Sequence, residues 1–231
     1  MPLRVFWLLL HVAGLGFALS AADRTPARSS SPKPVFLYCL HYQAPGENRY
    51  PADGSYQDIL GRLREHFEVR VSAERPTARS LQDVSVVLIA NPNDRAFRTN
   101  PPPPHLNPDD VRTWSRFVDG GGGLIVLGNQ EGHNLETSDF NRLLRGFGLQ
   151  LTNRYHDAKL IPIAPGTPVV GGLHWGYYTG NEILLTGKHR APPRALASND
   201  PAQPTLTQRR NEPGILLAIA EPGRVRLRPT P

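Results

Sequence analysis

Three apolar runs without a charged residue constrain the fold of this chain more than any other feature of its sequence. They are VFLYCLH at 35–41, VSVVLIA at 84–90 and GLIVLG at 123–128. A strand with one face in water alternates apolar and polar residues, whereas a strand that is apolar throughout is covered on both faces. The three runs therefore predict buried strands of a mostly parallel sheet.

Helical spacing appears between these runs. The apolar residues from Tyr56 to Phe67 recur at helical intervals, and Ser55 with Asp58 has the pattern of a capping box. A further helix follows the third run, and we expect Ser138 to cap it. Helices between buried strands are what an α/β sheet requires.

The best helix start in the sequence is Asn107, which is followed by Pro108, Asp109 and Asp110. Asparagine caps the free N–H groups, proline fits the first turn, and carboxylates at the positive end of the helix dipole are stabilising. We expect this helix to end at Gly120.

Two more strands complete the predicted order. FEVRVS at 67–72 alternates, as a strand near a sheet edge does, and LQLTN at 149–153 reads as a fifth strand. We therefore predict an α/β core at residues 35–154, a flavodoxin-like doubly wound, mostly parallel sheet. For residues 155–223 we predict a strand- and loop-rich C-terminal extension of the same domain.

The N-terminus reads as a signal peptide at residues 1–22. Arg4 is followed by the apolar run VFWLLLHVAGLGFAL and by small residues that allow cleavage after Ser20 or Ala22. An uncleaved membrane anchor is the alternative, although the run is short for a membrane span. We expect an exported protein, periplasmic or secreted, with a Ser/Pro-rich linker at 23–34.

The chain is basic, with a formal net charge of +6, and much of the excess lies near a basic tail at 224–231. Because basic and aromatic residues are not interleaved, we expect no nucleic-acid partner. The single Cys39 allows no internal disulfide and predicts a small buried hydrophobe.

The third apolar run leads into Gly128-Asn129-Gln130-Glu131-Gly132, which has the spacing of a nucleophile elbow. The residue at the nucleophile position is glutamine, which cannot attack a carbonyl. The sequence thus keeps the turn of an enzyme without its nucleophile.

Three loops should converge at the carboxyl ends of the strands, after residues 40, 90 and 128. They carry polar side chains whose amides and carboxylates suit hydroxyl groups. The residues that we expect to bind a ligand are His41, Arg49, Asn129, Gln130, Glu131, His133 and Asn134.

Other chemistries fit less well. Cys39 stands on the wrong strand for a Cys–His pair, and no serine lies between Gly120 and Thr137 for a serine triad. His41, Glu131 and His133 lack the tight spacing of a metal motif, so neither a metal nor a cofactor is expected. The aromatic patch GGLHWGYYTG at 171–180 suits a sugar or a partner, or else covers the sheet edge.

The stretches VSVVLIANP, WSRFVDGGGGLIVLG and NRLLRGFGLQLTN resemble the class I glutamine amidotransferase-like superfamily. The resemblance covers about half the chain and is strongest to exported, trehalose-utilisation-like and uncharacterised envelope branches. It implies a catalytic cysteine at the position where this chain has Gln130. It also implies a His-x-Glu pair near the end of the domain, but neither His174 nor His189 has a glutamate two positions after it. Relatives also continue beyond the equivalent of GRVRLRPTP, so we expect a closing strand and helix to be missing.

These features predict an exported, amidotransferase-like domain that does not hydrolyse glutamine. It would bind a small polar ligand, such as a carbohydrate, or an envelope protein. The alternative is a sugar-processing hydrolase or isomerase that uses Glu131 or His133 as acid or base. A purely structural role is the third possibility.

Overall fold

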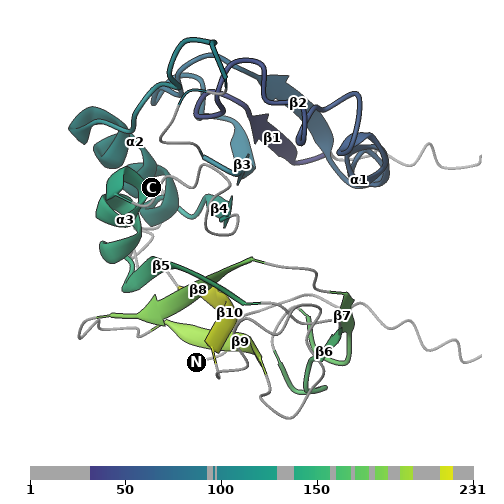
Figure 1. The fold of residues 1–231 in the computed structure, drawn as a ribbon. Helices are drawn as coiled ribbons and strands as arrows, with labels where there is room; N and C mark the ends of the chain where they lie inside the picture. The colour runs from purple at the N-terminus through teal and green to yellow at the C-terminus, as the bar shows by residue number, and fades with distance from the viewer. Residues whose placement is uncertain are drawn as a thin grey trace, which may run out of the picture. The chain divides into compact units, whose positions relative to one another are not determined.

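The computed structural model describes residues 32–92, 96, 98–128, 138–156, 160–167, 170–176, 180–186, 193–199 and 214–220. Figure 1 shows the helices and strands in these ranges. In chain order they are β1 (Val35–Cys39), α1 (Gln57–Leu63), β2 (Glu68–Ser72), β3 (Val84–Ala90), α2 (Pro108–Asp119), β4 (Gly123–Leu127), α3 (Ser138–Arg145), β5 (Leu149–His156), β6 (Leu160–Pro162), β7 (His174–Gly176), β8 (Gly180–Leu185), β9 (Arg194–Asn199) and β10 (Gly214–Ile219).

The first four strands form a parallel sheet in the order β2-β1-β3-β4. This order reverses direction between β1 and β3, as in flavodoxin-like folds, and places a crevice at the carboxyl ends of those two strands. The α/β fold expected from the apolar runs is therefore confirmed.

Helices cover both faces of this sheet, and the side chains of β1 alternate between the two faces. Val35, Leu37 and Cys39 point to one face, where Trp114 of α2 and Phe140 of α3 complete a buried cluster. The Trp114 ring donates a hydrogen bond from Nε1 to the hydroxyl of Tyr42 at 3.1 Å. This face is closed by two helices.

Phe36 and Tyr38 point to the opposite face and pack with Leu60 of α1 and with Leu88 and Ala90 of β3. A single helix of seven residues and the loop before it cover this side. A sheet with helices on both faces is doubly wound, as predicted.

The start of α2 follows the sequence prediction. Asn107 accepts hydrogen bonds from the N–H groups of Asp109 and Asp110, and the Asp110 carboxylate accepts one from the N–H of Asn107. This reciprocal capping box satisfies free N–H groups of the first turn, and the helix ends at Gly120 as expected.

The capping box predicted for α1 is wrong. The N-cap of α1 is Tyr56, which makes no side-chain hydrogen bond to the helix, and Ser55 lies outside it. The helix is held by the burial of Leu60 rather than by its cap, because Leu60 is fully buried while Ile59 is half exposed.

The fifth strand forms where the sequence predicts it, but it does not extend the parallel sheet. β5 pairs with β8 in an antiparallel sheet of order β5-β8-β10-β9, and β6 pairs with β7 in a small second one. The C-terminal extension is thus built of antiparallel strands.

The expectation that β4 is buried on both faces is also wrong. Leu124 and Val126 pack against the α2 and α3 side, but Ile125 and Leu127 on the opposite side are 43% and 42% exposed. Within the described residues β4 lies at the edge of the parallel sheet and pairs with β3.

None of the helices in the described parts of the chain is long and apolar enough to cross a membrane. The predicted signal peptide at 1–22, most of the linker at 23–34 and the basic tail at 224–231 lie outside those parts. Their boundaries stay predictions.

Candidate functional site

The loops that follow β1 and β3 meet at the carboxyl end of the parallel sheet. Gln43, on the first loop, donates through Nε2 to the carbonyl oxygen of Ala90 at 3.1 Å and contacts the Tyr38 hydroxyl at 3.4 Å. Ala90 is the last residue of β3, so this amide joins the ends of the two strands. Two of the three loops predicted to converge therefore do so.

A second contact between these loops involves Gly46 and Asn100. The side-chain amide of Asn100 lies where a β-carbon on residue 46 would stand, and Gly46 has a φ of 81°. Both conditions favour glycine, because a left-handed backbone is strained for other residues. The two loops pack closely only while residue 46 has no side chain.

His41 lies at the end of β1, as predicted, and its ring is held on the β2 side. Its Nδ1 donates to the carbonyl oxygen of Ala73 at 3.1 Å, and the ring meets Tyr42 edge-on at 4.9 Å. A neutral imidazole that donates through Nδ1 carries its lone pair on Nε2. His41 can therefore accept a hydrogen bond from a ligand hydroxyl.

Arg49 is already paired with Glu47, two residues before it. Its Nε and its backbone N–H donate to Glu47 Oε1 at 2.8 and 2.9 Å, and its Nη2 pairs with Oε2. Burial alone would raise the pKa of the Glu47 carboxyl, but the hydrogen bonds and charge of Arg49 outweigh burial and hold that pKa below its usual value. The charge of Arg49 is therefore neutralised locally.

The Glu47 side chain is fully covered, whereas the Arg49 side chain remains 33% exposed. The guanidinium carbon lies 5.6 Å from the centre of the Tyr50 ring, within cation–π range. An arginine in this state offers hydrogen-bond donors with little net charge. It suits a neutral polar ligand better than an anion.

Tyr50, which lies beside this pair, belongs to a cluster of three tyrosines, and none of the three was predicted as a site residue. The rings of Tyr38 and Tyr56 stack at 5.1 Å, Tyr50 meets Tyr56 edge-on at 6.0 Å, and the Tyr38 hydroxyl donates to the Tyr50 carbonyl at 2.8 Å. Burial raises the pKa of Tyr50 to about 12, so its phenol stays protonated. Tyr50 and Tyr56 are only partly buried and could stack against a ligand.

Cys39 takes no part in this site. Its thiol is buried on the α2 side of the sheet, and burial raises its pKa to about 11. A protonated, buried thiol is a poor nucleophile. The sequence prediction that Cys39 acts as a small hydrophobe is consistent with this environment.

The end of β4 is tied to the same region. The N–H of Asn91 donates to the carbonyl oxygen of Leu127 at 2.8 Å, and Asn91 is buried with a φ of 47°. The predicted ligand residues that follow β4 lie outside the described residues; they are Asn129, Gln130, Glu131, His133 and Asn134. Their part in the site stays a prediction.

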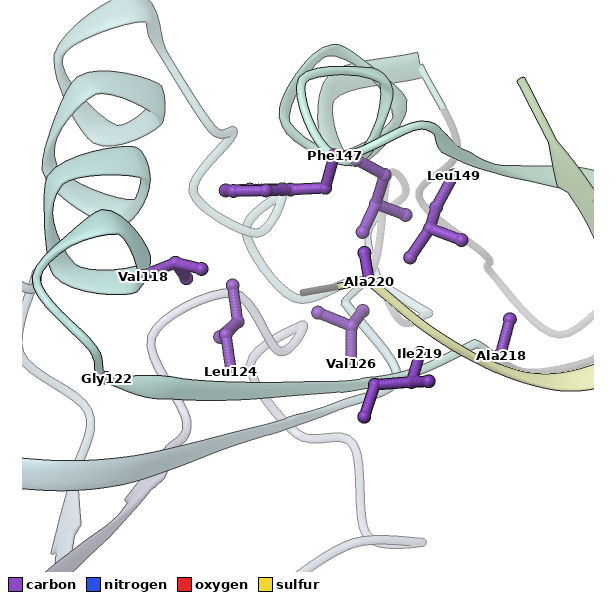
Figure 2. Close-up of a pocket in the computed structure, with 10 residues that line it drawn as sticks. Val118, Gly122, Leu124, Val126, Phe147, Leu149, Ala218, Ile219 and Ala220 are labelled. Atoms are coloured by element: carbon purple, nitrogen blue, oxygen red, sulfur yellow. The ribbon is translucent and has the colours of Figure 1, made fainter. Parts of the chain in front are cut away.

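No group of three or more histidine, cysteine, aspartate or glutamate side chains able to hold a metal occurs in the described ranges. An apolar cavity of about 220 Å³ lies elsewhere, against β4 (Figure 2). Residues of α2, β4, α3 and β10 and their flanks line it: Val118, Gly122, Leu124, Val126, Leu144, Phe147, Leu149, Ala218, Ile219 and Ala220. None of them belongs to the loops that carry the polar site.

No protein-family model matches the sequence, and no curated protein matches it. Among solved structures, the chain is similar to the mmIFT52 N-terminal domain, with a TM-score of 0.52 and 14% identity over 71% of this chain and 72% of that one. At this identity the similarity shows the fold alone. A ThuA-like protein from Bacteroides uniformis ATCC 8492 is similar at a TM-score of 0.45 and 10% identity, over 76% and 72% of the two chains.

Proposed function

We propose that this chain is an exported, amidotransferase-like domain that does not hydrolyse glutamine and that binds a small neutral polar ligand, a carbohydrate. The proposed site lies at the carboxyl ends of β1 and β3. Asn129, Gln130, Glu131, His133 and Asn134 would contribute to it from the loop after β4. The observation that carries the proposal is the neutralised Glu47–Arg49 pair beside the partly exposed Tyr50 ring.

This arrangement matches the two kinds of contact that a sugar offers. Its hydroxyl groups would accept hydrogen bonds from the remaining N–H groups of Arg49. Its C–H face would lie on the ring of Tyr50. His41 packs on Tyr42 of the α2-side cluster, whereas Tyr50 packs on the α1 side, so a contact of the same ligand with His41 stays a prediction. The carboxylate of a sugar acid would add little to the affinity, because Glu47 already compensates the positive charge of Arg49 that would attract it.

The assignment against glutamine hydrolysis rests on the side chains. Gln130 stands where the resemblance places the catalytic cysteine, and the thiol of Cys39 is buried with a raised pKa. Neither residue can supply a thiolate to attack an amide.

The test is a thermal-shift screen of the full chain against neutral sugars, sugar acids, glutamine and divalent metals. A ligand that binds the folded state raises the Tm by mass action, and we expect neutral sugars to do so more than sugar acids. Tyr50→Leu should weaken the binding about two- to tenfold, since an aromatic contact contributes roughly 0.5–1.5 kcal/mol. Arg62→Ala, an exposed arginine on α1, is the matched control and should leave it unchanged.

The other outcomes separate the rival functions. A shift with sugar acids alone, or one that Tyr50→Leu leaves intact, would contradict this site. No shift with any compound would favour an envelope protein as the ligand. Turnover of a sugar that disappears in Glu131→Gln while binding persists would instead make the protein an enzyme.

Export is tested separately. The N-terminal residue of protein recovered outside the cytoplasm should be Ala21 or Asp23, as cleavage after Ser20 or Ala22 requires. An intact Met1 would favour the uncleaved anchor.

A further inference from the structure

A run of four consecutive prolines, at residues 101–104, lies in the segment that leads into α2. Proline fixes its own φ near about −65° and excludes the helical conformation for the residue before it. Residues 100–103 each precede a proline, and no peptide bond in the described residues is cis. The run is therefore restricted to a polyproline II helix, which has three residues per turn.

The burial of this segment repeats every third residue, as expected for a polyproline II helix that lies on a protein surface. The buried residues are Pro103 and Leu106, three positions apart. The residues before and between them are exposed; they are Pro101, Pro102, Pro104 and His105. One edge of the helix therefore faces the protein, and two edges face outward.

Contacts at both ends hold the segment in this conformation. Before it, the side-chain amide of Asn100 packs against the loop that follows β1. After it, Nδ1 of His105 lies 2.8 Å from Oδ2 of Asp139 on α3. Arg142 of the same helix donates through Nη2 to the carbonyl oxygen of Leu106 at 2.9 Å. A segment that is held in one conformation before binding loses little conformational entropy when it binds.

The chemistry of the outward edges indicates the kind of protein that would bind them. Proline has no N–H group, so the run has no backbone donors with which to pair as a strand. It offers ring faces and backbone carbonyl oxygens instead. Grooves lined by aromatic side chains bind such segments, because the aromatic rings contact the prolines while tyrosine and tryptophan donate hydrogen bonds to the carbonyls.

We propose that Pro101 and Pro104 dock in an aromatic-lined groove of a partner protein. They have the P-x-x-P spacing that such grooves recognise, and one turn of the helix places them on the same outward edge. Pro103 stays buried against this chain, so docking requires no displacement of the loop. Neither docking proline belongs to the proposed ligand site, so this proposal and the carbohydrate proposal are tested separately.

NMR titration of isotopically labelled probe domains with the full chain tests the proposal. The probes are an SH3, a WW and an EVH1 domain, each of which has an aromatic groove. We expect at least one probe to bind with shifts confined to its groove, including the indole N–H of a groove tryptophan. The double variant Pro101→Ala/Pro104→Ala should weaken this binding at least about fivefold, because it removes both docking rings. Pro34→Ala, at an exposed proline just before β1, is the matched control and should bind as the wild type does.

Three results overturn the proposal. The first is the absence of groove shifts in all three probes at concentrations of the chain up to about 1 mM, the weak end of specific binding. The second is a double variant that binds as tightly as the wild type, because the contact then involves another part of the chain. The third is an equal loss of binding in Pro34→Ala.

A second measurement covers the case in which the double variant disturbs the fold, and it keeps all four prolines. Thr99 is exposed and stands two residues before Pro101. A spin label on Thr99→Cys should broaden the groove resonances of a bound probe, whereas a label on Val71→Cys, on the exposed part of β2, should not. The wild type treated with the same label reports whether the buried Cys39 reacts. Failure of the Thr99→Cys label to broaden the groove above the Val71→Cys level overturns the proposal.

Discussion

The two edges of the parallel sheet are stabilised by different forces. On β2, Arg70 forms exposed ion pairs with Glu68 and Asp83. On β4, Leu124 and Val126 pack against the buried cluster formed with α2 and α3. Exposed ion pairs contribute little to stability, whereas buried apolar side chains contribute most of it. Side chains on the α2 side of the sheet should therefore contribute far more to the free energy of unfolding than the charges on β2 do.

The largest expected effect is the protection of the Cys39 thiol from labelling, since Cys39 lies on the interior strand β1 and faces the α2 side. Burial and its raised pKa leave the thiol unreactive until the structure opens. At pH 8 we expect a disulfide reagent to label it on the order of 1,000-fold more slowly in the native protein than in urea. Similar rates in both states would show that the α2 side opens readily.

Trp114→Ala should destabilise the fold by about 3–5 kcal/mol, since it removes a fully buried ring and its hydrogen bond to Tyr42. Urea unfolding followed by circular dichroism measures this change. Trp114→Phe, which keeps most of the ring volume, is the control and should cost less. If Trp114→Ala lowers the free energy of unfolding by less than about 1 kcal/mol, the packing of α2 on the sheet contributes little to stability.

Asn107→Ala should cost about 0.5–2 kcal/mol, because it removes the side-chain half of the capping box that starts α2. The same urea titration measures it. Asn107→Asp keeps an acceptor oxygen at the N-cap and should stay close to the wild type. Equal losses in both variants would assign the effect to something other than capping.

Arg70→Ala should have the smallest effect on the free energy of unfolding, close to the error of the urea titration, because both of its ion pairs are exposed to solvent. The difference from the wild type should shrink further in 1 M salt, where exposed charges are screened. A loss as large as that of Trp114→Ala would erase the contrast between the two edges.

Features set by neighbours in sequence were predictable. The capping box at Asn107 and Asp110 needs only residues three positions apart, so the sequence contains all of its partners. For α1 the same reasoning failed, because the helix begins at Gln57, after Tyr56, and leaves Ser55 outside. A polar residue near a helix start caps it only when the backbone places it at the N-cap.

Strand pairing was less predictable because it depends on contacts distant in sequence. β5 was found where expected, yet its partner is β8, some thirty residues later and antiparallel. β4 is as apolar as β1, and nothing within its five residues shows that it lies at an edge. Apolar runs predict strands well but not which strands lie beside them.

In the site, the position of a residue was predictable and its partner was not. His41 lies at the end of β1, as the topology requires, but its ring bonds to Ala73 after β2. The charge of Arg49 is compensated by Glu47, only two residues away. No sequence motif includes Gln43 or Tyr50. Their roles follow from the contacts that the loop after β1 makes in the folded protein.

The close packing of Asn100 on Gly46 also makes residue 46 a position from which the crevice can be widened. A methyl group there would meet the Asn100 amide and would strain a backbone that has a φ of 81°. It would act as a wedge between the loops that follow β1 and β3. Substitution of Gly46 would thus alter the shape of the proposed ligand site without changing any side chain that would touch the ligand.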